Sequence, residues 1–122
     1  MHITHLSAEC YPAAKAGGLG DVVGALSKYL NKLGETCEVI LPKYKTKWLD
    51  AQEYEMVWES DARLGRDYFS FQIFKVKGDP LGFPLYTVHI PNLLDRPGVY
   101  IDPWTGRGYN DEFERFTSFQ IA

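Results

Sequence analysis

The first 42 residues limit the possible folds most, because two apolar runs flank a glycine-rich turn and a helical pattern. Residues 3–7 predict a buried strand, and residues 37–41, which Pro42 closes, predict a second one. Between them, apolar side chains recur every three or four positions, which predicts an amphipathic helix that Gly34 ends. Its apolar positions are Leu19, Val22, Val23, Leu26, Leu30 and Leu33. This βαβ unit predicts an α/β fold with a parallel sheet.

The remaining residues predict further strands and one more helix. Apolar and polar side chains alternate within residues 67–77, and a turn at residues 78–82 separates them from the apolar run 85–90, so the two segments predict a hairpin-like strand pair. Residues 54–58 predict a short strand, and a helical pattern begins near Asn110. No repeat or linker divides the chain. We therefore expect one domain built on an open, mainly parallel sheet with flanking helices.

Composition excludes several classes of protein. Thirteen basic and sixteen acidic residues give a net charge of −3, and the basic residues form no stripe, which argues against nucleic-acid binding. No apolar stretch approaches the roughly 20 residues that a membrane span needs, and no leader pattern precedes the first strand. We therefore expect a cytoplasmic protein with no membrane partner.

The turn before the helix is the one segment whose pattern points to chemistry. Its sequence is Lys15-Ala16-Gly17-Gly18-Leu19-Gly20-Asp21-Val22. At a helix start, unpaired N–H groups and the positive end of the helix dipole face one point, where an anion can bind. Glycine lets a ligand approach the backbone, and a lysine adds positive charge. The turn predicts a site for a phosphate-bearing small molecule; the alternative is that the glycines serve only packing and that Lys15 is solvated.

Two common phosphate-binding patterns do not fit this turn. A P-loop needs a lysine and a hydroxyl residue after its last glycine, whereas here the lysine comes first. A dinucleotide fold needs G-x-G-x-x-G and an acidic residue about 20 positions later. Gly18, Gly20 and Gly24 have a longer spacing, and the second strand ends without the acid. What remains is a lysine upstream of paired glycines, with Asp21 in the first helical turn.

The turn resembles the K-x-G-G-L-x-D-V segment of bacterial glycogen synthases and plant starch synthases. Other segments resemble motifs of the same family, in the same order along the chain. They are Ser7-Ala8-Glu9-Cys10-Tyr11-Pro12, similar to an S-E-x-x-P stretch; Ile40-Leu41-Pro42-Lys43-Tyr44 at the second-strand exit; Asp95-Arg96-Pro97-Gly98-Val99-Tyr100, similar to D-R-P-G-x-Y; and Tyr109 to Phe116, similar to Y-x-D-N-x-x-R-F. Glu112 stands where the last motif has asparagine. Residues 51–84 match least specifically.

The resemblance implies part of a GT-B glycosyltransferase, in which two Rossmann-like domains face a cleft. Residues 1–122 would form the first part of the N-terminal, acceptor-side domain, and the second domain would lie outside this chain. Such enzymes move glucose from ADP-glucose, or sometimes UDP-glucose, to the non-reducing end of an α-1,4-glucan with retention of configuration. The resemblance implies no cofactor, and the chain has no D-x-D pair that would indicate a metal ion. Because half of the site would be absent, we expect residues 1–122 alone to be inactive.

The resemblance also implies roles for five residues. Lys15, Gly17 and Gly18 would approach the phosphates of the donor, and Asp21 would line the same cleft as a candidate catalytic residue. A lysine and preorganised amides would stabilise the negative charge of a departing nucleoside diphosphate. Tyr100 would bind sugar by stacking and a hydrogen bond, or it would pack under its own loop.

Two other function classes remain open. One is a different GT-B sugar-nucleotide transferase, against which the D-R-P-G-x-Y loop argues. The other is a non-catalytic module that binds nucleotide or carbohydrate. For the remaining prominent aromatic side chains, Tyr11, Trp58 and Trp104, we expect packing rather than ligand binding.

Overall fold

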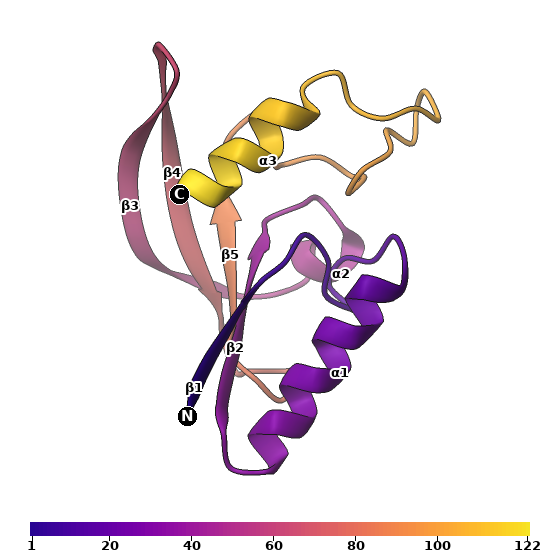
Figure 1. Cartoon of the computed structure of the whole chain (residues 1–122), viewed down its shortest axis with the longest axis vertical. Helices are drawn as coiled ribbons and strands as arrows, with labels where there is room; N and C mark the ends of the chain where they lie inside the picture. Colours follow the sequence, from indigo (N-terminus) through magenta and orange to yellow (C-terminus); the bar gives the residue numbers. More distant parts are fainter.

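The computed structural model describes all residues from Met1 to Ala122 and shows a five-stranded open sheet with flanking helices (Figure 1). The strands are β1 (His2–Leu6), β2 (Thr36–Pro42), β3 (Tyr54–Leu64), β4 (Asp67–Val76) and β5 (Leu85–His89). The helices are α1 (Gly18–Lys32), α2 (Lys47–Asp50) and α3 (Glu112–Ile121). The order across the sheet is β1-β2-β5-β4-β3.

The parallel half of the sheet consists of β1, β2 and β5, and it confirms the predicted βαβ unit. All three strands end at the edge of the sheet where α1 begins (Figure 1). In β2, Val39 and Leu41 are fully buried, as predicted. The prediction of a buried first strand was wrong, since β1 is partly exposed and Leu6 is 70% exposed. The reason is that β1 lies at the edge of the sheet and pairs only with β2.

The other half of the sheet is antiparallel. β5 pairs with β4, which confirms the predicted hairpin-like pair. β4 also pairs with β3, and the register runs from Tyr54↔Val76 to Leu64↔Asp67. β3 therefore extends well beyond the predicted residues 54–58. Charged residues at alternate, exposed positions of its second half hide this extension in the sequence; they are Glu59, Asp61 and Arg63.

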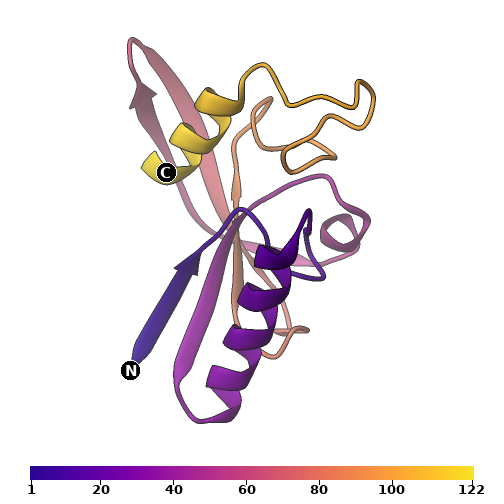
Figure 2. The ribbon, with the colours of Figure 1, turned by 45° about the vertical axis from the view of Figure 1, so that its right-hand side comes forward.

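The core lies on both faces of the sheet. Val39 and Leu41 of β2 pack in one cluster with Val23 of α1. Ile40, which points to the opposite face because strand side chains alternate, packs against a second cluster that contains Phe119 of α3. Helices α1 and α3 therefore cover opposite faces, as the turned view shows (Figure 2). This arrangement confirms the predicted open sheet with helices on its two sides.

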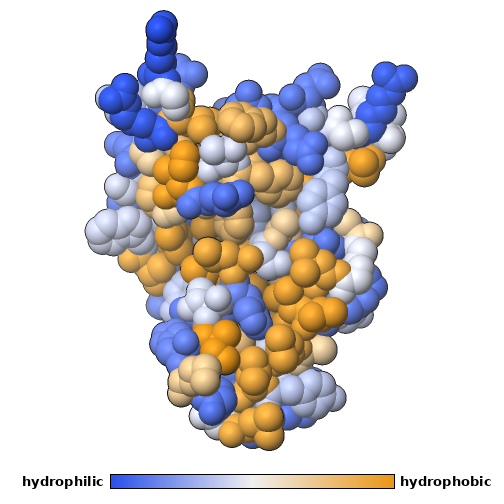
Figure 3. Space-filling model, in the orientation of Figure 1, coloured by the Kyte–Doolittle hydropathy of each residue, from blue (hydrophilic) through white to orange (hydrophobic).

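Helix α1 buries a different face from the one predicted. Its buried residues are Gly20, Val23, Gly24 and Ser27. Most of the predicted apolar positions are exposed instead, with exposures of 50% for Leu19, 60% for Val22, 45% for Leu26 and 80% for Leu33. Apolar side chains accordingly gather on the surface over α1 (Figure 3). The small residues face inward because the backbone of the loop after β1 packs directly against the helix there.

The closest of these contacts is at Gly24. A Cβ atom on Gly24 would lie 2.6 Å from the carbonyl oxygen of Tyr11. Because that oxygen belongs to the backbone, it cannot rotate away, and we expect Gly24→Ala to lower the free energy of unfolding by about 1–3 kcal/mol. Urea unfolding measures the difference. Gly108→Ala is the control, since its nearest neighbour would be 3.9 Å away; equal losses in the two variants would contradict this explanation.

Candidate functional site

The predicted turn lies between β1 and α1, at the edge where the parallel strands end (Figure 1). Gly17 is the N-cap residue of α1, and no side chain caps the helix. The amides of Gly18 and Leu19 therefore have no partner within the helix. A Cβ atom on Gly17 or Gly18 would meet no atom within 4 Å, so the space beside both residues is open. An anion has both room and hydrogen-bond donors at this point.

The other two glycines of α1 serve packing. A Cβ atom on Gly20 would lie 3.4 Å from the Cβ atom of Glu9 and 3.4 Å from the carbonyl oxygen of Ala14. Gly24 is still closer to the backbone of Tyr11. The two explanations that the sequence left open thus apply to different glycines: Gly20 and Gly24 allow close packing, whereas nothing packs against Gly17 and Gly18.

Lys15 and Asp21 form an ion pair beside the open space. The Nζ atom of Lys15 lies 2.8 Å from Oδ2 of Asp21 and 5.7 Å from the centre of the Tyr11 ring. The hydrogen bond to Asp21 raises the pKa of Lys15, so the lysine is charged at neutral pH. Both side chains are about half exposed, and exposed ion pairs contribute little stability. A more strongly charged ligand can therefore replace Asp21 as the partner of Lys15.

Glu9 lies directly behind the turn, although the sequence pattern did not mark it as a site residue. It is only 3% exposed. Its Oε1 atom accepts hydrogen bonds from the N–H groups of Ala16 at 2.6 Å and Gly17 at 2.7 Å. Burial would raise the pKa of Glu9, but these hydrogen bonds and one from Tyr100 outweigh burial, so the pKa lies below its usual value. The only signal in the sequence was the position of Glu9 in the segment Ser7 to Pro12.

Tyr100 reaches the same carboxylate from a loop 91 positions away along the chain. Its hydroxyl donates to Oε2 of Glu9 at 3.1 Å, and its ring centre lies 5.9 Å from that of Phe116. Burial and this hydrogen bond raise the pKa of Tyr100. The half-buried ring also borders a hollow of about 440 Å³ that Leu6 and Ala8 help to line. Tyr100 is thus packed on one side and faces open space on the other.

Arg115 of α3 holds the loop that carries Tyr100. It is fully buried, and its guanidinium donates to three carbonyl oxygens: Nε to Leu93 at 2.7 Å, Nη1 to Val99 at 3.0 Å and Nη2 to Gly98 at 3.3 Å. Burial lowers the pKa of Arg115, but a guanidinium group stays protonated in proteins, so this side chain is charged. One side chain therefore fixes the backbone on both sides of the turn that precedes Tyr100.

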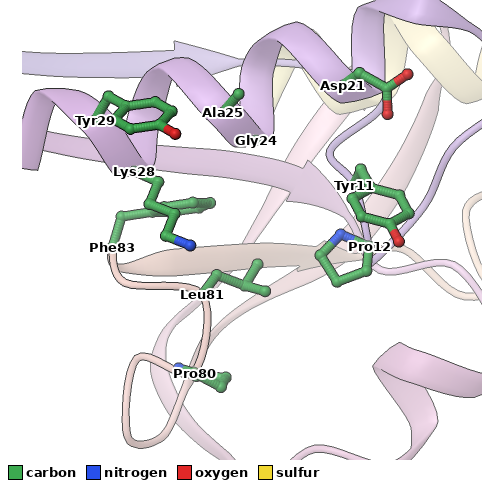
Figure 4. A pocket seen from close by; sticks show the side chains of 10 residues that line it. All are labelled: Tyr11, Pro12, Asp21, Gly24, Ala25, Lys28, Tyr29, Pro80, Leu81 and Phe83. Atoms are coloured by element: carbon green, nitrogen blue, oxygen red, sulfur yellow. The ribbon is translucent and has the colours of Figure 1, made fainter.

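A second hollow of about 460 Å³ lies beside the site, along α1 (Figure 4). Tyr11 and Pro12 lie at one end of this hollow, and the loop between β4 and β5 forms the wall that faces α1 (Figure 4). Asp21 and Tyr11 line this hollow and also contact Lys15, so the hollow lies next to the turn. Neither Gly17 nor Gly18 lines it, and the hollow is therefore distinct from the open space at the helix start.

The prediction that three other aromatic side chains are packed was wrong. Trp104 is 87% exposed, Trp58 is 60% exposed and Tyr11 is 56% exposed. Trp104 lies in the loop after Asp102, and Trp58 lies in β3, the outermost strand of the antiparallel half. In both places no helix covers the side chain, which explains the exposure.

None of the three helices combines the length and the apolar character that crossing a membrane requires. No three side chains among His, Cys, Asp and Glu lie close enough together to share a metal ion.

Comparison with protein families and curated proteins gives consistent matches. Residues 2–122 match the family described as the starch synthase catalytic domain. The chain is 47% identical over 122 residues to a glycogen synthase of Flavobacterium johnsoniae and 34% identical over 129 residues to the probable starch synthase 4 of Arabidopsis thaliana. Both alignments cover 100% of this chain, but only 24% and 11% of those relatives. The chain thus spans about a quarter of the bacterial relative.

A solved structure also resembles the chain. It is the catalytic domain of starch synthase IV from Arabidopsis thaliana bound to ADP and acarbose, with a TM-score of 0.77 and 28% sequence identity. The similarity covers 97% of this chain and 23% of that one. The fold predicted from the sequence, an α/β open sheet like that of a domain of a GT-B glycosyltransferase, is therefore confirmed.

Proposed function

Because the chain belongs to the starch synthase catalytic domain family, we propose that residues 1–122 form the first part of the acceptor-side domain of a two-domain glycosyltransferase. The complete protein transfers glucose from ADP-glucose, or UDP-glucose, to the non-reducing end of an α-1,4-glucan with retention of configuration. The observation that carries this proposal is the open helix start at Gly17 and Gly18, with the charged side chain of Lys15 beside it. The second domain is expected outside these residues.

The helix start binds the diphosphate of the donor. The free amides of Gly18 and Leu19 point along the positive end of α1, and Lys15 exchanges Asp21 for a phosphate oxygen. The bond between the glucose C1 atom and the diphosphate oxygen breaks, and the diphosphate leaves with the electron pair; the 4-hydroxyl oxygen at the non-reducing end of the glucan bonds to C1 on the same face, and its proton passes to the leaving diphosphate. A lysine and fixed amides stabilise this developing charge without reorganising.

Asp21 and Tyr100 complete this half of the site. Once a phosphate has replaced it on Lys15, the carboxylate of Asp21 is free to accept hydrogen bonds from the nucleotide sugar, which is the role we propose for it. Tyr100 binds sugar with the open side of its ring, which borders the hollow beside Leu6. The solved relative bound to ADP and acarbose supports a nucleotide and a carbohydrate as ligands of such a site.

The proposal is tested with the complete protein, glycogen as acceptor and radiolabelled ADP-glucose or UDP-glucose as donor. We expect incorporation of glucose into the glucan and α-configured linkages in the product. Transfer only from another donor, or to another acceptor, would indicate a different GT-B enzyme. Binding of nucleotide or glucan without any transfer would indicate a non-catalytic module.

Residues 1–122 expressed alone are expected to show no glucan elongation. The helix start contacts only the phosphate side of the donor, and groups that bind the base and assist bond cleavage are expected in the second domain. The same radiolabel assay, with the complete protein as positive control, measures the difference. Elongation by the isolated residues 1–122 would contradict the assignment of half a site to them.

A further inference from the structure

Glu9 is a buried carboxylate that no basic side chain neutralises. It is 3% exposed, and the partners of its carboxylate come from two separate segments: the turn before α1 and the loop of Tyr100. The nearest lysine in the turn, Lys15, forms its ion pair with Asp21 instead. The charge of Glu9 is therefore balanced by backbone amides and by the positive end of α1.

The hydrogen bonds of Glu9 decide which amides a ligand can reach. Ala16 and Gly17 donate to Oε1 of Glu9 at 2.6 Å and 2.7 Å, so their N–H groups are already occupied. The next amides along the chain, those of Gly18 and Leu19, have no side-chain cap. An incoming phosphate is thereby directed to Gly18 and Leu19 and kept away from the base of the turn.

The second carboxylate oxygen of Glu9 binds Tyr100, the residue proposed to bind sugar. Oε2 of Glu9 accepts the hydroxyl of Tyr100 at 3.1 Å. One side chain therefore sets the position of the phosphate-binding turn and of the Tyr100 ring together.

We propose that Glu9 is a positioning residue, whose carboxylate occupies the first two amides of the turn and so places the donor's diphosphate on the following ones, while it holds Tyr100 against the site. This role rests on the proposed function. It depends on the reach and shape of the side chain more than on its charge, because both oxygens are used. Glutamine retains that shape: its Oε1 accepts from the amides, and its Nε2 donates to the hydroxyl oxygen of Tyr100. Aspartate is one methylene shorter and cannot reach both partners.

The test uses the complete protein with Glu9→Ala, Glu9→Asp and Glu9→Gln. We expect Glu9→Ala and Glu9→Asp to raise the KM for the sugar nucleotide by about tenfold or more, because the phosphate-binding amides are no longer held in register. Glu9→Gln is expected to keep this KM within about threefold of the wild type, whereas Glu9→Ala and Glu9→Asp, which also release Tyr100, are expected to raise the KM for glucan as well. Glu38→Ala is the matched control, since Glu38 also bridges two partners, Thr4 and His2, but at the opposite end of β1.

Several outcomes would overturn the proposal. An unchanged KM for the sugar nucleotide in Glu9→Ala and Glu9→Asp, with only a lower thermal midpoint, would show a merely structural role. A loss in Glu9→Gln as large as in Glu9→Ala would show that charge, and not shape, is required. If the wild-type protein itself transfers no glucose, the proposed function fails, and calorimetric binding of ADP then tests Glu9 separately. In that experiment, weaker ADP binding by Glu9→Ala and Glu9→Asp than by the wild type and Glu9→Gln supports the positioning role. Equal ADP affinities of all four proteins overturn it.

Discussion

Lys15→Ala in the complete enzyme is expected to lower kcat/KM for the sugar nucleotide by at least about tenfold. Lys15 lies in the same turn as Gly17 and Gly18, where the diphosphate is proposed to leave, and its Nζ atom carries a positive charge. Its loss removes an interaction that strengthens as the negative charge develops, so kcat should fall together with kcat/KM. Initial rates at varied donor and saturating glucan concentrations measure both quantities.

Lys32→Ala is the control for this substitution. Lys32 lies in the last turn of the same helix, with its Nζ 5.2 Å from the centre of the Tyr29 ring, far from the turn. Both lysines are exposed, so neither substitution is expected to unfold the protein. Wild-type kinetics in Lys15→Ala, or equal losses in the two variants, would exclude the role assigned to Lys15.

The largest effect on stability is expected for Arg115→Ala, which should lower the free energy of unfolding by about 3 kcal/mol or more. The substitution leaves the buried carbonyl oxygen of Val99 and the partly buried ones of Leu93 and Gly98 without their donor, and it removes a fully buried side chain beneath the loop. Urea unfolding measures the loss. Because this loop carries Tyr100, the substitution should also weaken glucan binding at temperatures where the protein remains folded.

Two further variants separate the contributions of charge and geometry at Arg115. Arg115→Lys keeps the charge but lacks the planar fork that reaches three carbonyl groups, so we expect it to recover only a minor part of the lost stability. Arg63→Ala is the exposed control, since Arg63 contacts only the ring of Tyr68, at 5.1 Å. A loss in Arg115→Ala no larger than in Arg63→Ala would contradict the role of Arg115 in holding the loop from α3.

Patterns between near neighbours predicted much of the fold correctly. The apolar run at residues 37–41, the alternation in residues 67–77 and the helical pattern after Asn110 each correspond to an element of the structure. These signals depend on spacings of two to four residues, which are set by the local geometry of strands and helices. The second half of β3 was missed for the same reason, because charged residues such as Asp61 and Arg63 at its exposed positions obscure the alternation.

The buried face of α1 shows where such patterns fail. Leu19, Val22 and Leu26 have the spacing of a buried stripe, yet the structure buries Gly20 and Gly24. The spacing of apolar residues predicts that a helix has an apolar side, but it does not predict which part of the fold packs against which side of the helix. Here the backbone of the loop at Tyr11 packs closely against the helix, and only glycine leaves room for it.

For the candidate site, the sequence was sufficient to predict an anion-binding turn, because a lysine, paired glycines and a helix start are adjacent in the chain, and their expected effect on an anion follows from backbone geometry. The contact between Glu9 and Tyr100 became visible only in three dimensions, because it joins side chains 91 positions apart. Such a contact depends on how the sheet and α3 place two loops, and no local pattern records that distance. The tertiary structure thereby showed that the predicted anion-binding turn belongs to a network, with the carboxylate of Glu9 behind it and the hydroxyl of Tyr100 hydrogen-bonded to that carboxylate.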